Sequence, residues 1–272
     1  MPQISAEENI STIYSTLARA WGPQHWWPAK NRFEVIVGAC LTQNTSWRNV
    51  EIALRELRSA SALSVQGIRN IPLARLQRLI RSSGYFRQKA RKLKIFVNFL
   101  DHRYGGSLTK MFAQPTAELR EQLLSLNGVG PETADSILLY AGQHPVFVVD
   151  AYTRRLAARH RAISEKAGYE EIRSLFEQAL TRAEHIEVPG VDARGYMVPV
   201  RTGVDARPSV AGGSAAHRPS RMSVAKRTPL AQVFNEMHGL IVSAGKQYCL
   251  KSKAQCDQCP LGPLLPTQMS SH

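Results

Sequence analysis

Apolar residues recur at helical spacing through most of the chain, and this periodicity restricts the fold more than any other feature. The clearest case runs, at steps of three and four, through Leu93, Phe96, Val97, Leu100 and Tyr104. Such spacing puts apolar side chains on one face of an α-helix, whereas a strand needs alternation at every second residue. Sustained alternation is hard to find, so we expect an all-α protein.

The periodicity and the short Gly- and Pro-rich breakers together predict a series of helices. Their expected ranges are 6–20, 33–42, 47–59, 72–82, 86–104, 116–125, 131–142, 151–160, 169–182 and 229–244. The breakers between these helices are too short to be domain linkers.

Residues 188–228 differ from the rest of the chain. They are rich in Gly, Pro, Ser, Ala and Arg, and the string "VDAR" occurs in them twice. This composition predicts a flexible surface insertion. A basic arm that binds phosphates and an insertion without a function are both open alternatives.

The charge balance favours a polyanionic partner. The 35 Lys and Arg outnumber the 21 Asp and Glu, which gives a formal net charge of +14. Nucleic acid is favoured over a membrane, although a well-solvated basic surface is the plain alternative. The sequence contains no run of about twenty apolar residues and no signal-peptide pattern at its start, so we expect a soluble, cytoplasmic protein.

The stretch "LNGVGPETA" predicts a tight turn between two helices. Gly128 and Gly130 flank Val129, and glycine accepts the positive φ and the close backbone approach that such a turn requires. Pro131 suits the first position of the following helix, whose free N–H groups can bind a phosphate. An ordinary helical hairpin is the alternative that the stretch alone leaves open.

Several motifs together resemble the endonuclease III superfamily of helix-hairpin-helix (HhH-GPD) DNA glycosylases. "LNGVGPETADSILLYA" followed by "FVVDAYTRR" is similar to its hairpin and aspartate signature. "FEVIVGACLTQNTSWRNV" is similar to an early helix and turn, and "YCLKSKAQCDQCPL" to a C-terminal cysteine loop. The matches extend from Trp26 to Leu261 outside the insertion. Asn127 departs from the usual Pro of the family.

The resemblance implies a two-lobed all-α fold. A helical barrel lobe is expected over residues 30–145, ending in the hairpin. The second lobe is expected from residues 1–29 plus 146–272, and it would include the insertion and the cysteine loop 249–259. The family acts on double-stranded DNA with a damaged base. We therefore expect a monomeric DNA repair enzyme, associated with the nucleoid if the source is bacterial.

The resemblance makes Asp150 the catalytic aspartate. A carboxylate can stabilise the positive charge that develops on the sugar as a glycosidic bond breaks, and it can orient the attacking water. An N-cap for the next helix is the plain explanation of Asp150, and the two roles can coexist. Members that also cut the backbone carry a lysine where this chain has Glu132. This implies a monofunctional glycosylase.

The resemblance is closest to the 3-methyladenine glycosylases of the endonuclease III type. Trp27 and Trp47 match their two base-stacking positions, and indole rings would favour a cationic alkylpurine. Gln43 matches the residue that fills the gap left by the flipped base. The tryptophans at 26 and 27 are also explained as core residues, and Lys246 as a solvated lysine that could reach the pocket.

Three cysteines match part of the iron–sulfur loop of the family. Cys249, Cys256 and Cys259 have gaps of six and two residues and so match its first three ligands, but Leu265 stands where the fourth ligand is expected. A [4Fe–4S] cluster and a relic that has lost its cluster are both open. Zinc would need a further ligand, and His272 is nearby in sequence.

Two other functions are compatible with the sequence. One is a bifunctional glycosylase and AP lyase acting on oxidised pyrimidines through an amine elsewhere in the chain. The other is a non-catalytic protein that keeps the hairpin, with Gly128, Val129 and Gly130, only for binding DNA phosphates.

Overall fold

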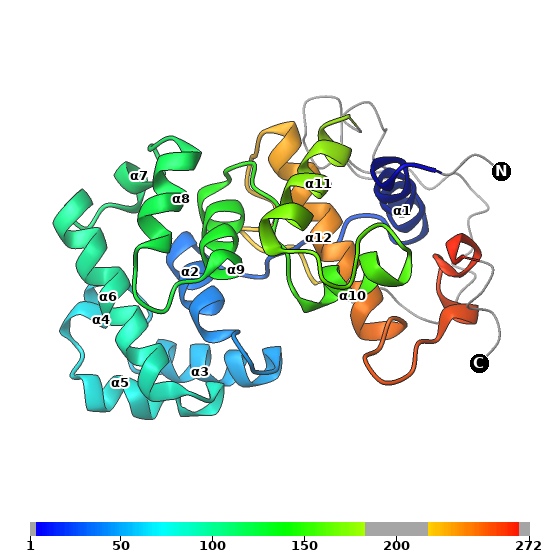
Figure 1. The fold of residues 1–272 in the computed structure, drawn as a ribbon. Helices are drawn as coiled ribbons and strands as arrows, with labels where there is room; N and C mark the ends of the chain where they lie inside the picture. The colour runs from blue at the N-terminus through cyan, green and yellow to red at the C-terminus, as the bar shows by residue number, and fades with distance from the viewer. Residues whose placement is uncertain (1–3, 183–216, 267–272) are drawn as a thin grey trace. The chain divides into compact units, whose positions relative to one another are not determined.

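A computed structural model describes residues 4–182 and 217–266. The described residues are helical and contain no strand, which confirms the all-α prediction (Figure 1). Residues 29–144 form one compact unit. The described parts of 1–28 and 145–272 form a second unit, so the second unit uses both ends of the chain.

The first unit holds nine helical segments and, after them, one π-helix. In chain order they are α2 (Arg32–Leu41), α3 (Trp47–Ser59), α4 (Val65–Asn70), α5 (Leu73–Leu79), η1 (Arg81–Ser83), α6 (Phe86–Tyr104), α7 (Leu108–Met111), α8 (Thr116–Leu124) and α9 (Pro131–Ser136). The π-helix η2 (Ile137–Gly142) follows α9 directly. Helix α2 is buried from Phe33 to Leu41 and packs on η2, α3 and α6, so it forms the centre of this unit.

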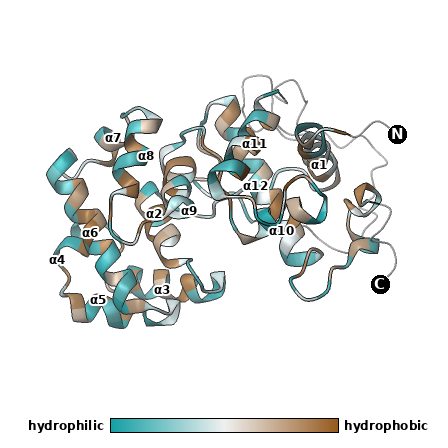
Figure 2. Ribbon diagram, in the orientation of Figure 1, coloured by the Kyte–Doolittle hydropathy of each residue, from teal (hydrophilic) through white to brown (hydrophobic). Residues whose placement is uncertain are grey.

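The second unit is built around α12 (Pro229–Gln247), with α1 (Ala6–Trp21), α10 (Ala151–Arg159) and α11 (Tyr169–Arg182) packed against it. All residues of α12 from Ala231 to Gly245 are buried. Helix α1 shows the amphipathic pattern instead, with hydrophobic and hydrophilic residues on different faces (Figure 2). The short helices η4 (Cys256–Gln258) and η5 (Gly262–Leu264) follow α12.

Helices α1 and α12 begin where the local sequence predicts a helix start. Ser5 caps α1 with a capping box shared with Glu8, and Thr228 caps α12 ahead of Pro229. The predicted ranges agree with most of the long helices to within a residue or two. The short helices α4, α7, η4 and η5 were not predicted, because fewer than two turns show no usable periodicity.

The C-terminal end of the predicted insertion is anchored at a few residues. Residues 188–216 lie outside the described residues, and within 217–228 Met222, Ser223 and Arg227 are buried although half of this stretch is exposed. Arg227 donates hydrogen bonds to the carbonyl of Met222 and to Gln232. One apolar side chain and one guanidinium that satisfies backbone carbonyls fix this stretch despite its loop-like composition.

Candidate functional site

Asp150 is the N-cap of α10. Its Oδ1 accepts hydrogen bonds from the backbone N–H of Thr153 at 2.8 Å and from the Thr153 hydroxyl at 3.0 Å. The Asp150 side chain is 16% exposed, so it is largely enclosed but still reachable. The capping role is therefore real, and it uses one carboxylate oxygen.

The second oxygen of Asp150 faces His238, which the sequence did not predict as a site residue. His238 Nε2, on α12, lies 3.6 Å from Asp150 Oδ2. Burial raises the pKa of the Asp150 carboxyl, but His238 and the two bonds from Thr153 outweigh burial and lower the pKa below its ordinary value. Nothing in the sequence pairs these residues, because they lie far apart in the chain and His238 belongs to a helix that is buried on all sides.

Trp26 packs beside His238. Its ring centroid is 6.1 Å from that of His238, and the Lys246 ammonium lies 5.6 Å from the centroid of the Trp26 ring. Gly239 makes this packing possible, since a Cβ there would stand 3.0 Å from Trp26 Cβ. Trp27, the predicted stacking residue, is 5% exposed, and its carbonyl accepts a hydrogen bond from Ser220.

A buried polar network supports the segment before Trp27. Glu236 accepts hydrogen bonds from the Gln24 backbone N–H at 2.9 Å and from the Gln232 amide at 3.0 Å. Asn235 donates a 2.6 Å hydrogen bond to the Trp26 carbonyl. Burial raises the pKa of Glu236 to about 7. The backbone of this segment is therefore held by side chains of α12.

The predicted hairpin joins α8 to α9 within the first unit. Gly128 has φ +83°, a conformation that favours glycine, and Val129 is buried as the plug of the turn. Gly130 has φ −92°, so its φ does not require glycine, and a Cβ added there would meet open space. A buried Arg120–Asp135 pair, with bonds of 2.7 and 3.0 Å, links the two helices.

The structure brings Gln43 to the hairpin. The Gln43 amide nitrogen donates to the Thr133 hydroxyl at 2.6 Å, and its oxygen accepts from Lys92 Nζ at 2.5 Å. Lys92 is buried, and burial lowers its pKa. A groove of about 600 Å³ opens here, lined by Gln43, Asn44, Tyr85, Gln88, Lys89, Arg91, Lys92, Ile95, Asn127 and Gly128.

Glu132 and Trp47 also lie in the first unit. Glu132 is exposed in the first turn of α9, where the helix dipole stabilises a carboxylate. Trp47 begins α3, is half-buried, and donates from its indole nitrogen to Glu51 at 3.0 Å. The predicted residues thus form two groups: Gln43, Trp47, Glu132 and the hairpin in one unit, and Asp150, Trp27 and the cysteines in the other.

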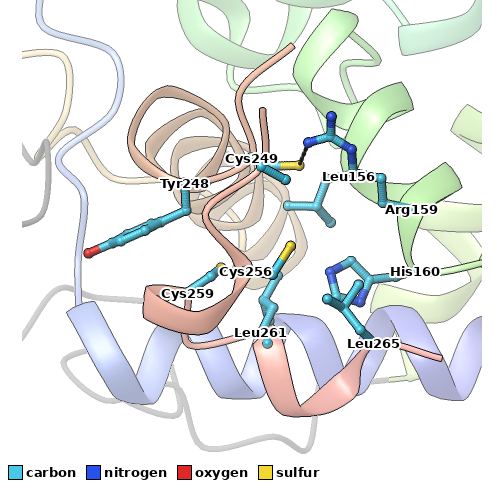
Figure 3. Close-up of a pocket in the computed structure, with 11 residues that line it drawn as sticks. Leu156, Arg159, His160, Tyr248, Cys249, Cys256, Cys259, Leu261 and Leu265 are labelled. Atoms are coloured by element: carbon cyan, nitrogen blue, oxygen red, sulfur yellow. Dashed lines mark hydrogen bonds between the residues drawn. The ribbon is translucent and has the colours of Figure 1, made fainter. Parts of the chain in front are cut away.

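The three C-terminal cysteines line one pocket of about 20 Å³, together with Arg159, His160 and Leu265 among others (Figure 3). Arg159 Nη1 donates to Cys249 Sγ at 3.1 Å. Burial raises the pKa of Cys259, and the neighbouring Cys249 and Cys256 add to this. In the described part of the chain, no group of three His, Cys, Asp or Glu side chains is placed to hold a metal ion.

The residues present do not fit a [4Fe–4S] cluster held by four thiolates. Leu265, at the expected fourth position, lines the pocket with an apolar side chain that cannot ligate iron. Hydrogen bonds hold the loop to α10, where Arg155 donates to the Cys249 carbonyl at 2.6 Å and Arg159 to the Leu250 carbonyl at 2.8 Å.

No described helix is long and apolar enough to span a membrane.

Comparison with known proteins identifies the family. Residues 37–182 match the family described as HhH-GPD superfamily base excision DNA repair protein. The Methanocaldococcus jannaschii protein MJ1434, a relative named for DNA repair glycosylase activity, is 38% identical over 93% of this chain and 94% of its own. An endonuclease III from Thermotoga maritima is 30% identical over 47% of this chain and 55% of its own.

A solved structure supports the same assignment. The Helicobacter pylori 3-methyladenine DNA glycosylase MagIII, bound to 1,N6-ethenoadenine, is 26% identical with a TM-score of 0.66, covering 89% of this chain and 98% of its own. The chain therefore belongs to the HhH-GPD superfamily of base excision DNA repair proteins, with the all-α fold of the endonuclease III-like DNA glycosylases.

Proposed function

We propose that the protein is a monofunctional DNA glycosylase that removes a damaged base from duplex DNA by hydrolysis and leaves the strand intact. The observation that carries this proposal is that the chain has an enclosed carboxylate at Asp150, whose pKa is lowered, and Glu132 instead of a lysine at the position where the lyase members of the family carry one. A carboxylate can stabilise a positively charged sugar and orient water, whereas a glutamate side chain cannot form a Schiff base.

DNA binding is assigned to the hairpin and the groove beside Gln43. The turn at Gly130 leaves space next to the first N–H groups of α9, and Lys89, Arg91 and Lys92 line the groove. Backbone amides and cations of this kind bind phosphates, and a net charge of +14 adds long-range attraction. Gln43, fixed at both ends of its amide, is the residue we propose to occupy the gap left by a flipped base.

An alkylated purine is the proposed substrate. The support comes from the similarity to MagIII, whose structure holds 1,N6-ethenoadenine, and from Trp47, which matches a base-stacking position of the 3-methyladenine glycosylases. Flipped bases are held between aromatic surfaces. Trp47 is half-buried, so its indole can still gain a stacking partner.

One observation favours the bifunctional alternative. The Lys246 amine lies 5.6 Å from the Trp26 ring centroid, in the same unit as Asp150, and could attack the sugar in place of the missing lysine. Oxidised pyrimidines would be the substrates in that case.

The test is to incubate the purified protein with methylated and with oxidised duplex DNA. We expect free alkylated bases, strand breaks only after hot alkali, and no protein–DNA adduct when borohydride is present. Trapping that is lost in Lys246→Met would support the bifunctional alternative, and release of no base from either DNA would contradict both proposals.

A further inference from the structure

His238 lies at the centre of a helix in which every neighbouring residue is buried. Its side chain is 4% exposed, and its Nε2 is 3.6 Å from Asp150 Oδ2. A histidine in such a helix could simply fill the core. The direction of its ring nitrogen, toward the proposed catalytic carboxylate, gives it a more specific role.

Two aromatic residues pack against the His238 ring. Trp26 lies at a centroid distance of 6.1 Å and Phe147 at 6.3 Å. Phe147 is itself fixed by stacking on Phe176 at 4.6 Å and by an edge contact with Phe234 at 5.8 Å. Close packing of this kind leaves the imidazole little rotational freedom. The nitrogen facing Asp150 is therefore kept in place by the core.

The two oxygens of Asp150 have different partners. Oδ1 accepts both hydrogen bonds from Thr153 and caps α10, and Oδ2 faces His238. A buried carboxylate that met only apolar groups would tend to take up a proton. A donor on the Oδ2 side opposes this and also fixes the direction in which that oxygen points.

We propose that His238 is a positioning residue for Asp150, holding the Oδ2 side of the carboxylate and keeping it anionic in an enclosed site. This inference rests on the proposed glycosidic bond hydrolysis, for which Asp150 must carry a negative charge. The elements that pack around this pair carry other titratable side chains, which are Tyr14 on α1, Tyr152 on α10, Glu236 and Lys246 on α12, and His217 beside Trp26. Of these, Tyr152 interacts with Asp150.

The experiment measures binding to two abasic-site analogues in duplex DNA. A pyrrolidine analogue carries a positive charge at the ring, like the sugar in the transition state, and a tetrahydrofuran analogue is neutral. The wild type should prefer the cationic analogue between pH 6 and pH 8. With the titration extended down to about pH 4, the pH at which this preference is half lost should be about one unit higher in His238→Phe than in the wild type, as expected if the Asp150 pKa rises by that amount, and the two proteins should agree at pH 8.

Two further variants make the test specific. His238→Gln keeps an N–H donor and should return the pH of half loss most of the way to that of the wild type. His144→Gln is the matched control, since His144 is buried in the other unit and hydrogen-bonds to Thr116 at 2.9 Å. It should behave like the wild type. If His238→Phe does not fold, as judged by circular dichroism, His238→Met serves the same purpose.

The outcomes separate the two proposals. A His238→Phe or His238→Met variant that keeps the wild-type preference at every pH overturns the role of His238. A wild type with no preference for the cationic analogue, unchanged in Asp150→Asn, overturns the proposed function itself. Base release at single turnover gives a second reading, since its decline at acid pH should move to higher pH in His238→Phe.

Discussion

Lys92 Nζ donates a 2.5 Å hydrogen bond to Gln43 Oε1, while the Gln43 amide nitrogen donates to Thr133 at 2.6 Å. The amide is thus fixed between α6 and α9, and its orientation is set before any DNA arrives. Lys92 also lies against the hairpin, because a Cβ on Gly128 would stand 3.2 Å from Lys92 Cε.

Lys92→Met should weaken binding to a duplex with an abasic site more than binding to undamaged DNA. The variant removes a charge-assisted hydrogen bond worth about 1.5–3 kcal/mol, so we expect at least a tenfold loss. Fluorescence anisotropy on both duplexes measures this. Lys110→Met, an exposed lysine of the same unit, is the control for lost charge. A full-size effect of Lys92→Met in a Gln43→Ala background would show that Lys92 does not act through Gln43.

Trp47→Ala should lower base release by about tenfold and leave binding to undamaged DNA within about twofold, because stacking on one base contributes about 1–3 kcal/mol. Trp27→Ala should instead lower the melting temperature, since Trp27 is 5% exposed and its removal leaves a cavity. Single-turnover base release and thermal unfolding distinguish the two. Equal losses of release and of undamaged-DNA binding in Trp47→Ala would indicate a structural role.

Glu132→Lys should introduce a borohydride-trappable adduct that the wild type lacks. Glu132 is exposed on α9, so lysine fits there without repacking, and its amine can then attack the sugar. Denaturing gels of protein and labelled DNA measure the adduct. Glu132→Gln is the matched control and should form none. Efficient trapping by the wild type would contradict the monofunctional assignment.

Leu265→Cys should complete a four-cysteine set and allow a [4Fe–4S] cluster to assemble. We expect anaerobically purified wild type to contain little iron, and the variant to show the broad visible absorbance of iron–sulfur proteins with about four irons per chain. Leu265→Ser is the control, because it changes the side chain without adding a thiolate. A brown wild type with four irons would show that three cysteines and another ligand suffice.

Glu236 should make the second unit less stable as pH rises. Its folded-state pKa of about 7 exceeds the ordinary value of 4.5, so its contribution is fully present below pH 4.5 and is lost as pH rises through 7. The total is on the order of 3 kcal/mol. The melting temperature of Glu236→Gln, relative to wild type, should therefore increase between pH 5 and pH 8. A constant difference across this range would contradict the raised pKa.

Local features of the sequence were enough to predict the helices and the hairpin. The apolar spacing in α6 and the residues Gly128 and Pro131 of the hairpin determine structure only within a few neighbouring residues. A short stretch of sequence is therefore enough to recognise them. His238 and Lys92 were not predicted, because their importance comes from partners distant in sequence. The packing of 217–228 was missed for the same reason, since Trp27 and Gln24 anchor it from the other end of the chain.

The use of both chain ends in the second unit has a consequence for synthesis. Residues 29–144 are continuous, so that unit can fold on the ribosome as soon as they emerge. Helix α1 is made before this unit and packs on α11 and α12, and α12 is made only after the whole of residues 29–144 and α11. Contacts of such long sequence separation form slowly. The nascent α1 must wait with its apolar face uncovered, and a chaperone that binds amphipathic helices would increase the yield of folded protein.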